Sequence, residues 1–276
     1  MIDLHTHTTA SDGRCTPPEL VARAMAAGVT VLSVTDHDTV AGGEAAAAAC
    51  RAAGIEFVAG IEVTAVLDGV DVHTLGYFVD VASPALAAFL TGQRRVRIDR
   101  LRQIVKLLTA HGIVLDADAI LKPALDDPSI SVGRPWIARA LVEAGCVGTT
   151  DDAFRLWLTP GRPAFVPRLG APPEEVIDRI HSASGIASVA HPGPRGLDEW
   201  LPRWVARAGL DAIEAYHPDH DANTTRRYVD LAAKLGVAVT GGSDYHADPS
   251  HGSSSIGSVS LPREDYEHLK AKLVNW

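Results

Sequence analysis

The chain has 276 residues, a length that allows one large α/β domain or a domain with a smaller insertion, and its 46% hydrophobic and 21% charged residues are ordinary for a globular protein. The formal net charge of −9 argues against broad nucleic-acid binding, so we expect no stable binding of a double-stranded nucleic acid. The sequence shows no signal peptide and no apolar run of the roughly 18 residues that a membrane span needs. Its three cysteines are scattered and form no CxxC pair. We therefore expect a cytoplasmic protein with no membrane association.

Short apolar runs alternate with helical segments in the first third of the chain. The segment from Ile2 to His7 is expected to form a strand, which would place His5 and His7 on one face. Further strands are predicted at 29–35, 55–63 and 71–78, and helices at 19–27 and 43–53. This alternation predicts a parallel sheet or barrel, in which functional side chains gather at the carboxyl ends of the strands.

The middle of the chain has a different pattern, because residues 84–161 contain no clear strand. Helices are predicted at 85–111, 115–121, 136–143 and 151–158, and the arginine-rich run from Arg94 to Arg102 is interpreted as a solvated helix face. Helices at 173–183, 197–208 and 221–235 then alternate with strands at 186–190, 212–215 and 237–240. We therefore predict a barrel formed by residues 1–95 and 165–276, with an inserted helical subdomain at 96–164.

Histidines and carboxylates recur where the predicted strands end. Six of the twelve histidines and four acidic residues occupy such positions, namely His5, His7, His37, His73, His191, His246, Asp12, Asp36, Glu62 and Asp244. Each has a structural alternative: His37 could cap a helix, His73 could be a satisfied histidine in a half-buried strand, and Asp244 could be an N-cap or Asx-turn residue. Jointly, imidazoles and carboxylates converging on one rim predict a multinuclear metal site.

Six ordered motifs carry a resemblance to a known family. HTHTTASDG, TDHDT, GIEVT, DVHTLGYF, HPGPR and GGSDYHA resemble the motifs of the PHP (polymerase and histidinol phosphatase) family. The resemblance implies an α/β fold, a distorted (β/α)7 barrel with a trinuclear metal site. The SVGRP and PGRPAFV stretches of the insertion resemble a bacterial stand-alone subgroup. Its members release the 3′-phosphate of nucleoside 3′,5′-bisphosphates, and some trim RNA from the 5′ end.

The resemblance also implies a ligand set of nine residues. His5, His7 and Asp244 would hold the first metal, Glu62 would bridge it to a second held with His73 and His191, and Asp12, His37 and His246 would hold the third. Asp36 is expected to orient a ligand histidine instead. Mixed histidine and carboxylate ligation suits divalent metals, so about three ions per chain are expected, with Mn²⁺ as the first choice and Fe²⁺ or Zn²⁺ as alternatives.

The function that this resemblance implies is hydrolysis of a phosphate ester by a metal-bridging hydroxide. His191, His217 and Asp244 are the predicted catalytic residues, with His217 as a proton donor or phosphate contact. Arg134 and Arg162, in turns bounded by glycine and proline, are predicted to bind the second phosphate of a small nucleotide or the 5′ end of a short RNA. Each of these three side chains has an alternative role: His217 as a solvated loop residue, and the arginines as helix caps or surface salt bridges.

Two other functions stay open from the sequence. A phosphomonoesterase of the histidinol-phosphate type would use the same metals. The inserted helices argue against it, because they would narrow the mouth of the barrel and change its charge. A non-catalytic metal-binding accessory module is a further alternative. The complete ligand set and the absence of a partner domain in this chain argue against that role.

Overall fold

The computed structural model describes residues 1–248 and 255–275, and within them seven strands form one sheet in the order β1 to β7. The strands are β1 (Ile2–Asp3), β2 (Val31–Val34), β3 (Glu56–Leu67), β4 (Val70–Tyr77), β5 (Ile186–Val189), β6 (Ala212–Tyr216) and β7 (Ala238–Gly241). The backbone N–H of Leu4 donates to the carbonyl of Gly241 at 3.2 Å, and Thr6 forms a parallel bridge with Tyr245. The two edges of the sheet therefore meet beyond β1 and β7, and the sheet is a nearly closed barrel.

The prediction of an all-parallel sheet is wrong for one strand. β4 is antiparallel to both β3 and β5, whereas the other neighbouring strands are parallel. The cause is a two-residue turn in which Asp68 and Gly69 have φ values of 49° and 80°, the backbone conformation that Asp-Gly favours in a tight hairpin. As a result Glu62 lies in the middle of β3, and it shares one face of the hairpin with His73.

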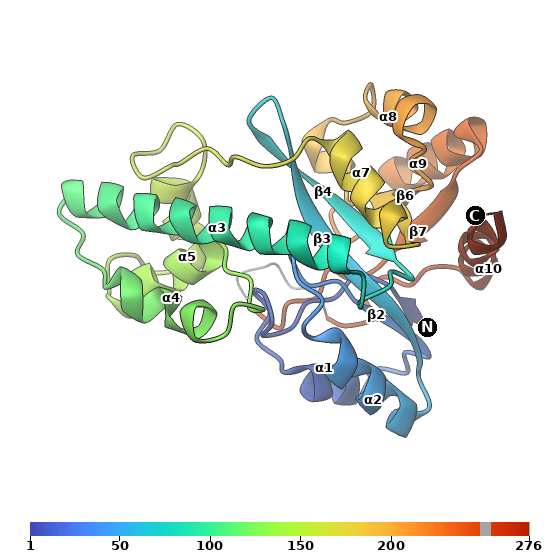
Figure 1. The fold of residues 1–276 in the computed structure, drawn as a ribbon, viewed down its shortest axis with the longest axis horizontal. Helices are drawn as coiled ribbons and strands as arrows, with labels where there is room; N and C mark the ends of the chain where they lie inside the picture. Colours follow the sequence, from blue (N-terminus) through green and yellow to red (C-terminus); the bar gives the residue numbers. More distant parts are fainter. Residues whose placement is uncertain (249–254, 276) are drawn as a thin grey trace.

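Helices cover the outside of the barrel (Figure 1). They are α1 (Pro17–Ala26), α2 (Gly43–Ala53), α7 (Pro173–Ser182), α8 (Leu201–Ala208), α9 (Ala222–Leu235) and α10 (Arg263–Ala271), with the short turns η2 (Gly193–Arg195) and η3 (Lys272–Asn275). α1 begins two residues before its predicted start, with a capping box between Thr16 and Glu19. α8 begins four residues later than predicted, and Pro202 occupies its first turn, where a missing N–H costs nothing.

The insertion is built on one long helix, α3 (Pro84–Ala110). It spans roughly 40 Å, starts against the barrel and continues beyond it to the helices of the insertion (Figure 1). These are α4 (Ala117–Asp126), α5 (Arg134–Glu143), α6 (Thr150–Ala153) and the π-helical turn η1 (Phe154–Leu158). They enclose a hydrophobic core of their own, which includes Leu101, Leu121, Ile137 and Leu158.

The large core of the barrel is a separate cluster of buried residues, with Trp204, Tyr77 and Tyr228 among its largest side chains. A third cluster lies between α1, α2 and β2. The predicted boundary at residue 96 falls inside α3, so one continuous helix joins the barrel to the insertion. None of the described helices combines the length and apolar sequence that crossing a membrane requires.

Candidate metal centre

The nine residues predicted as metal ligands lie together at one end of the barrel. Neighbouring imidazoles stand close, with ring centroids 5.2 Å apart for His5 and His7, 4.0 Å for His7 and His246, and 5.0 Å for His37 and His73. The nine are His5, His7, Asp12, His37, Glu62, His73, His191, Asp244 and His246, and each belongs to at least one group whose ligand atoms lie within 4.8 Å of one another. Side chains from segments far apart in the sequence, from His5 to His246, thus converge on one small volume.

Four ligand atoms surround the first candidate position. Asp244 Oδ1 lies 3.3 Å from His5 Nε2 and 3.1 Å from His7 Nε2, and Glu62 Oε2 lies 3.6 Å and 3.4 Å from the same two nitrogens. In a tetrahedral shell with metal–ligand bonds of about 2.1 Å, neighbouring ligand atoms are about 3.4 Å apart. The spacing therefore fits one divalent ion.

Two further groups adjoin the first. Glu62 Oε1 lies 2.8 Å from His73 Nδ1 and 3.3 Å from His191 Nε2, so the two oxygens of one carboxylate face different histidines. The carboxylate of Asp12 lies 3.2 Å from His246 Nε2 and 3.6 Å from His37 Nε2. His37 Nδ1 is also 2.9 Å from Glu62 Oε2. Because the groups share side chains, the allocation of each ligand to one ion stays a prediction.

Buried polar atoms at this site fit the presence of cations. His5 Nε2, both ring nitrogens of His7, His37 Nδ1 and Glu62 Oε2 are buried and make no hydrogen bond with the described residues. Leaving such atoms unpaired is costly, and a divalent ion would satisfy several of them at once. Burial lowers the pKa of His7 and His73 to about 3, which keeps both imidazoles in the neutral form that binds metals. Burial opposes ionisation of Glu62, but His37, His73 and His5 hold the pKa of its carboxyl well below its usual range.

Backbone conformation at the site is tightly constrained. His191 and Asp244 have φ values of 29° and 49°, a region that side chains rarely adopt and that is tolerated at functional sites. A Cβ atom at Gly242 would collide with the backbone of His5, so the glycine allows β7 to lead into the site. The buried carboxylate of Asp3 accepts hydrogen bonds from the Ser243 backbone at 2.9 Å and hydroxyl at 2.6 Å, which fixes the segment before Asp244.

Glu214 is a site residue that the sequence analysis missed. It is fully buried on β6, its Oε1 lies 2.9 Å from His5 Nδ1, and its Oε2 accepts a hydrogen bond from the His191 backbone at 2.7 Å. A proton held on His5 Nδ1 by this carboxylate leaves Nε2 free to bind a metal. The signal in the sequence is one charged residue inside the apolar strand from Ala212 to Tyr216.

Glu214→Gln is expected to weaken metal binding by about 10- to 100-fold while the fold stays intact, because the variant loses the charge that orients His5. Competitive titration with a metal-binding dye measures the affinity, and thermal unfolding monitors the fold. Glu199→Gln, an exposed change, is the matched control. An unchanged metal affinity in Glu214→Gln would show that the contact with His5 is only structural.

The prediction for Asp36 requires correction. Its carboxylate accepts hydrogen bonds from the Thr8 backbone at 2.7 Å, the Thr8 hydroxyl at 2.6 Å and the Ser11 hydroxyl at 2.6 Å. Among the described residues none of its hydrogen bonds goes to a histidine ring. Asp36 therefore stabilises the loop that leads to Asp12. Burial raises the pKa of its carboxyl, and these hydrogen bonds oppose that effect.

A cavity of about 410 Å³ opens onto the cluster. His217 is buried at its side, with Nε2 3.4 Å from Asp244 Oδ2, so it is not a solvated loop histidine. The structure therefore places all three predicted catalytic side chains at this cavity. Its lining residues are His37, Glu62, His73, His191, Pro194, Arg195, His217, Asp219, Asp244 and His246.

A second hollow of about 200 Å³, which we call the arginine hollow, shares ligand residues with the metal cluster. It is lined by Asp12, His37, Asp71, His73, Arg97, Gly133, Arg134, Pro135, Phe154 and Arg168. Arg134 Nη2 lies 3.4 Å from Asp71 Oδ2, and Arg168 Nε lies 3.5 Å from Asp71 Oδ1. Burial opposes ionisation of Asp71, yet Arg168, Arg134 and Arg100 hold the pKa of its carboxyl well below its usual range.

The interpretation of the arginine run as a solvated face is wrong for two of its members. Arg97 and Arg100 are only 4% and 5% exposed. Arg97 forms an ion pair with Asp38, and Arg100 Nη1 lies 3.6 Å from Asp71 Oδ2. Arg168 Nη1 also lies 3.5 Å from Asp38 Oδ2, so four guanidinium groups face two carboxylates. Positive charge is thus in excess beside the metal cluster.

Arg162 does not join this group. It is exposed in the turn after η1 and lines neither the cavity at the metal cluster nor the arginine hollow. Its predicted contact with substrate stays a prediction that this geometry does not support. Arg97 and Arg168 line the arginine hollow instead, and because they lie 71 residues apart the sequence did not indicate that they meet.

The nearly closed barrel with a histidine and carboxylate cluster at one end defines an α/β-barrel protein whose clustered side chains could hold metal ions. A family model described as the PHP domain matches residues 3–118. A 3′,5′-nucleoside bisphosphate phosphatase of Chromobacterium violaceum is 36% identical, with 99% of this chain and 98% of that protein covered. The chain therefore belongs to the PHP-domain family, as its ordered motifs indicated.

Two further relatives agree with this assignment. A 5′-3′ exoribonuclease of Haemophilus influenzae is 40% identical, with 88% of this chain and 89% of that protein covered. A solved structure from Bifidobacterium adolescentis, described as a candidate metal-dependent phosphoesterase, superimposes with a TM-score of 0.89 at 30% identity, covering 98% of this chain and 95% of that one. The similarity covers both barrel and insertion, so the expected distorted (β/α)7 fold is confirmed.

Proposed function

We propose that the protein is a metal-dependent phosphoesterase that hydrolyses the 3′-phosphate of nucleoside 3′,5′-bisphosphates and also trims short RNA from its 5′ end. The observation that carries this proposal is that the metal cluster and the arginine hollow share side chains. His37, His73 and Asp12 belong to the metal cluster and also line the arginine hollow. A substrate with two phosphates could place one at the metals and the other among the arginines. The names of the relatives from C. violaceum and H. influenzae agree with such substrates.

The nine ligand residues would hold about three ions, and Mn²⁺ is the ion we propose, with Fe²⁺ or Zn²⁺ as alternatives for the same donor set. Bound divalent ions would lower the pKa of a water molecule and neutralise charge on the reacting phosphate. We also propose a cytoplasmic location, because three cysteines that form no disulfide suit a reducing compartment.

The remaining groups of the cavity would orient the substrate and move its protons. His217 lies beside Asp244 at the cavity wall, and there its ring would donate a proton to the oxygen that leaves phosphorus. The carboxylate of Asp244 would keep that ring in place. His191, whose ring centroid lies 5.0 Å from that of His217, faces Glu62 in the same cavity, where it would help to hold the ions that bind the reacting phosphate.

The arginines would select substrates with a second phosphate. Arg134 is three-quarters buried, its guanidinium also donates to the carbonyl of Leu158 at 3.2 Å, and its position is therefore fixed before substrate arrives. Arg97 and Arg168 would add positive charge from α3 and from the chain leading to α7. A fixed guanidinium binds phosphate through two parallel hydrogen bonds.

Arg134→Ala is expected to reduce kcat/KM for adenosine 3′,5′-bisphosphate by about 10- to 100-fold, because a hydrogen bond to a charged group contributes about 1.5–3 kcal/mol. The rate on p-nitrophenyl phosphate, which has one phosphate, should change little. With Mn²⁺ present, the first rate is measured by release of phosphate and the second by release of p-nitrophenol. Arg155→Ala, an exposed change in the same insertion, is the control.

Equal losses on both substrates would contradict the role of Arg134 as the contact for the second phosphate. Failure of the wild-type protein to release phosphate from the bisphosphate would contradict the proposed function itself.

A further inference from the structure

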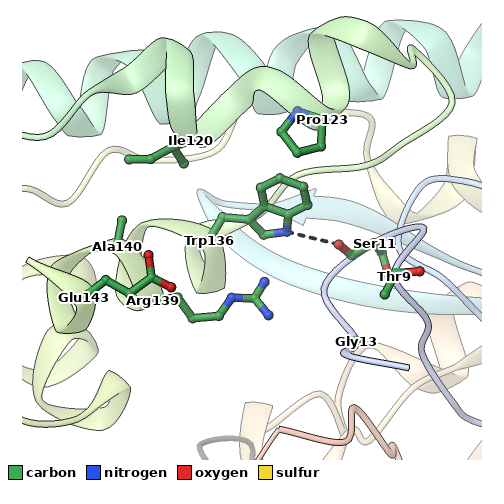
Figure 2. Close-up of a pocket in the computed structure, with 9 residues that line it drawn as sticks. All are labelled: Thr9, Ser11, Gly13, Ile120, Pro123, Trp136, Arg139, Ala140 and Glu143. Carbon is green, nitrogen blue, oxygen red and sulfur yellow. Dashed lines mark hydrogen bonds between the residues drawn. The ribbon is translucent and has the colours of Figure 1, made fainter. Parts of the chain in front are cut away.

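The loop that carries the candidate metal ligand Asp12 is bonded by the insertion. Three successive carbonyls of this loop, at Ala10, Ser11 and Asp12, each accept a hydrogen bond from it. The donors, in the same order, are the Ser131 backbone N–H at 2.9 Å, Trp136 Nε1 at 3.0 Å and Arg139 Nη1 at 3.3 Å. Figure 2 shows the bond from Trp136 to Ser11, with the indole standing between α4 and the loop. The insertion thus holds a segment of the barrel that bears a ligand.

The N–H groups of the same loop are bonded within the barrel. Those of Ser11 and Gly13 donate to the Thr8 carbonyl at 3.1 Å and 3.0 Å, and that of Arg14 donates to the His246 carbonyl at 2.8 Å. The three residues whose carbonyls are bonded by the insertion are at most 5% exposed, and buried carbonyls need partners. The barrel therefore supports one set of backbone groups of this loop, and the insertion supports the other.

The donors of the insertion are themselves held in place. Arg139 stands over the ring of Trp136, with its Cζ 6.0 Å from the ring centroid, and the two side chains are about one turn apart on α5, so both can face the loop. Arg97 Nη1 donates to the carbonyl of Val132 at 3.1 Å, which fixes the backbone next to Ser131. The contact with the loop is therefore made by groups whose positions are set within the insertion.

We propose that Trp136 and Arg139 are positioning residues of the metal centre, which hold the loop so that Asp12 binds an ion. This inference rests on the proposed function and gives the insertion a second task in it, beside the phosphate contact of Arg134. No step of the proposed reaction uses either positioning side chain directly. Both tasks come from one helix, because Arg134 begins α5 and the positioning side chains lie on the turns that follow.

The effect on metal binding should be confined to the ion that Asp12 holds. The Asp12 carbonyl accepts its bond from α5, while the Asp12 carboxylate lies 3.2 Å from His246 Nε2 and 3.6 Å from His37 Nε2. A displacement of this backbone therefore moves the ligand relative to its two histidines. Glu62 and His73 come from β3 and β4, so an ion between them should not depend on these bonds.

Trp136→Phe tests this proposal, because it keeps an aromatic ring on α5 and removes the N–H that bonds the loop. Trp157→Phe is the matched control, a change of the same kind at an indole packed against the core of the insertion. Each metal-free protein is titrated with Mn²⁺, and the free ion is measured by electron paramagnetic resonance. Asp12→Asn marks the ion in question as the one whose binding it weakens or abolishes.

Trp136→Phe should weaken that ion by about tenfold and leave the others unchanged, which is the lower end of the loss expected when a contact that orients a metal ligand is removed. Trp157→Phe should bind metal as the wild type does. In a double variant with Asp12→Asn, Trp136→Phe should cause no further loss, because its effect passes through the carboxylate. Unchanged binding in Trp136→Phe, equal weakening of every ion, further loss in the double variant, or full metal binding by Asp12→Asn would each overturn the proposal.

Hydrogen exchange tests the same contact without metal or substrate. In the metal-free protein, Trp136→Phe should speed exchange of the loop amides at Ser11, Gly13 and Arg14 by about fivefold, the effect of losing one hydrogen bond. Exchange in β5 should stay unchanged. Loop amides that exchange as slowly as in the wild type would show that the indole does not hold the loop, and would overturn the proposal.

Arg139→Met is the second variant if Trp136→Phe does not fold. It removes the donor to the Asp12 carbonyl and keeps an unbranched side chain, and the same losses are expected. Phosphate release from the bisphosphate is measured separately. If none is released but the pattern of metal binding and exchange holds, the insertion still positions Asp12 and only the proposed reaction fails. Absence of Mn²⁺ binding by the wild type would overturn this inference whatever the reaction.

Discussion

Glu62→Gln is expected to reduce the bound metal from more than two ions per chain to fewer than two, and to slow phosphate release on the order of 1,000-fold. Glu62 Oε2 faces His5 and His7, while Oε1 faces His73 and His191, so one carboxylate links the candidate metal positions. The amide replaces one anionic oxygen with an NH₂ group that cannot bind a metal. Loss of a ligand to catalytic metals costs several kcal/mol of transition-state stabilisation, and about 1.36 kcal/mol corresponds to a tenfold change in rate.

The metal content is measured by inductively coupled plasma mass spectrometry after gel filtration, and the rate by phosphate release. Glu56→Gln is the matched control, because Glu56 lies on the same strand but is exposed. A variant that keeps the wild-type metal content would show that Glu62 does not bridge two ions. Fewer than two ions in the wild type would contradict a trinuclear site.

His191→Ala is expected to abolish measurable turnover, with a loss on the order of 1,000-fold, while the protein stays folded. The imidazole faces Glu62 Oε1 at 3.3 Å and lines the cavity, whereas the hydrogen bond from the His191 backbone to Glu214 does not depend on the side chain. The variant should therefore lose a metal ligand and retain the local backbone. Steady-state rates and circular dichroism measure the two effects.

The control is His268→Ala, since His268 is exposed on α10 and does not line the cavity at the cluster. It should leave the rate unchanged. A rate within about twofold of the wild type in His191→Ala would remove this histidine from the metal centre.

The clustering of the candidate ligands could be predicted because they follow short strands in a recognisable order. His5 and His7 alternate along one segment, and GGSDYHA brings Asp244 and His246 together after the last strand. This spacing indicates a cluster of imidazoles and carboxylates, whereas the nine-residue ligand set came from the resemblance to the PHP-family motifs. Glu62 was included for the right chemistry but placed at the end of a strand. The structure puts it inside β3, because Asp68 and Gly69 turn the chain back into an antiparallel partner.

The arginine hollow could not be predicted in the same way. Arg97 and Arg100 lie in a run of like charges, which resembles a solvated helix face, and only their contacts with Asp38 and Asp71 from the barrel make burial possible. Arg168 joins them from a distant part of the chain, and Glu214 approaches His5 across the barrel from β6. Such pairings depend on how the insertion and the strands pack, which residue periodicity does not determine.

A substrate panel is the most direct test of the central claim, that the metal cluster and the arginine hollow together hydrolyse phosphates of nucleotides. The panel contains adenosine 3′,5′-bisphosphate, a 5′-phosphorylated oligoribonucleotide and histidinol phosphate, each with Mn²⁺ and, as a control, with a chelator. The account predicts metal-dependent release of the 3′-phosphate from the bisphosphate with kcat/KM at least about tenfold above that for histidinol phosphate, because a second charged contact contributes about 1.5–3 kcal/mol. Equal or faster hydrolysis of histidinol phosphate, or release that persists without metal, would contradict it.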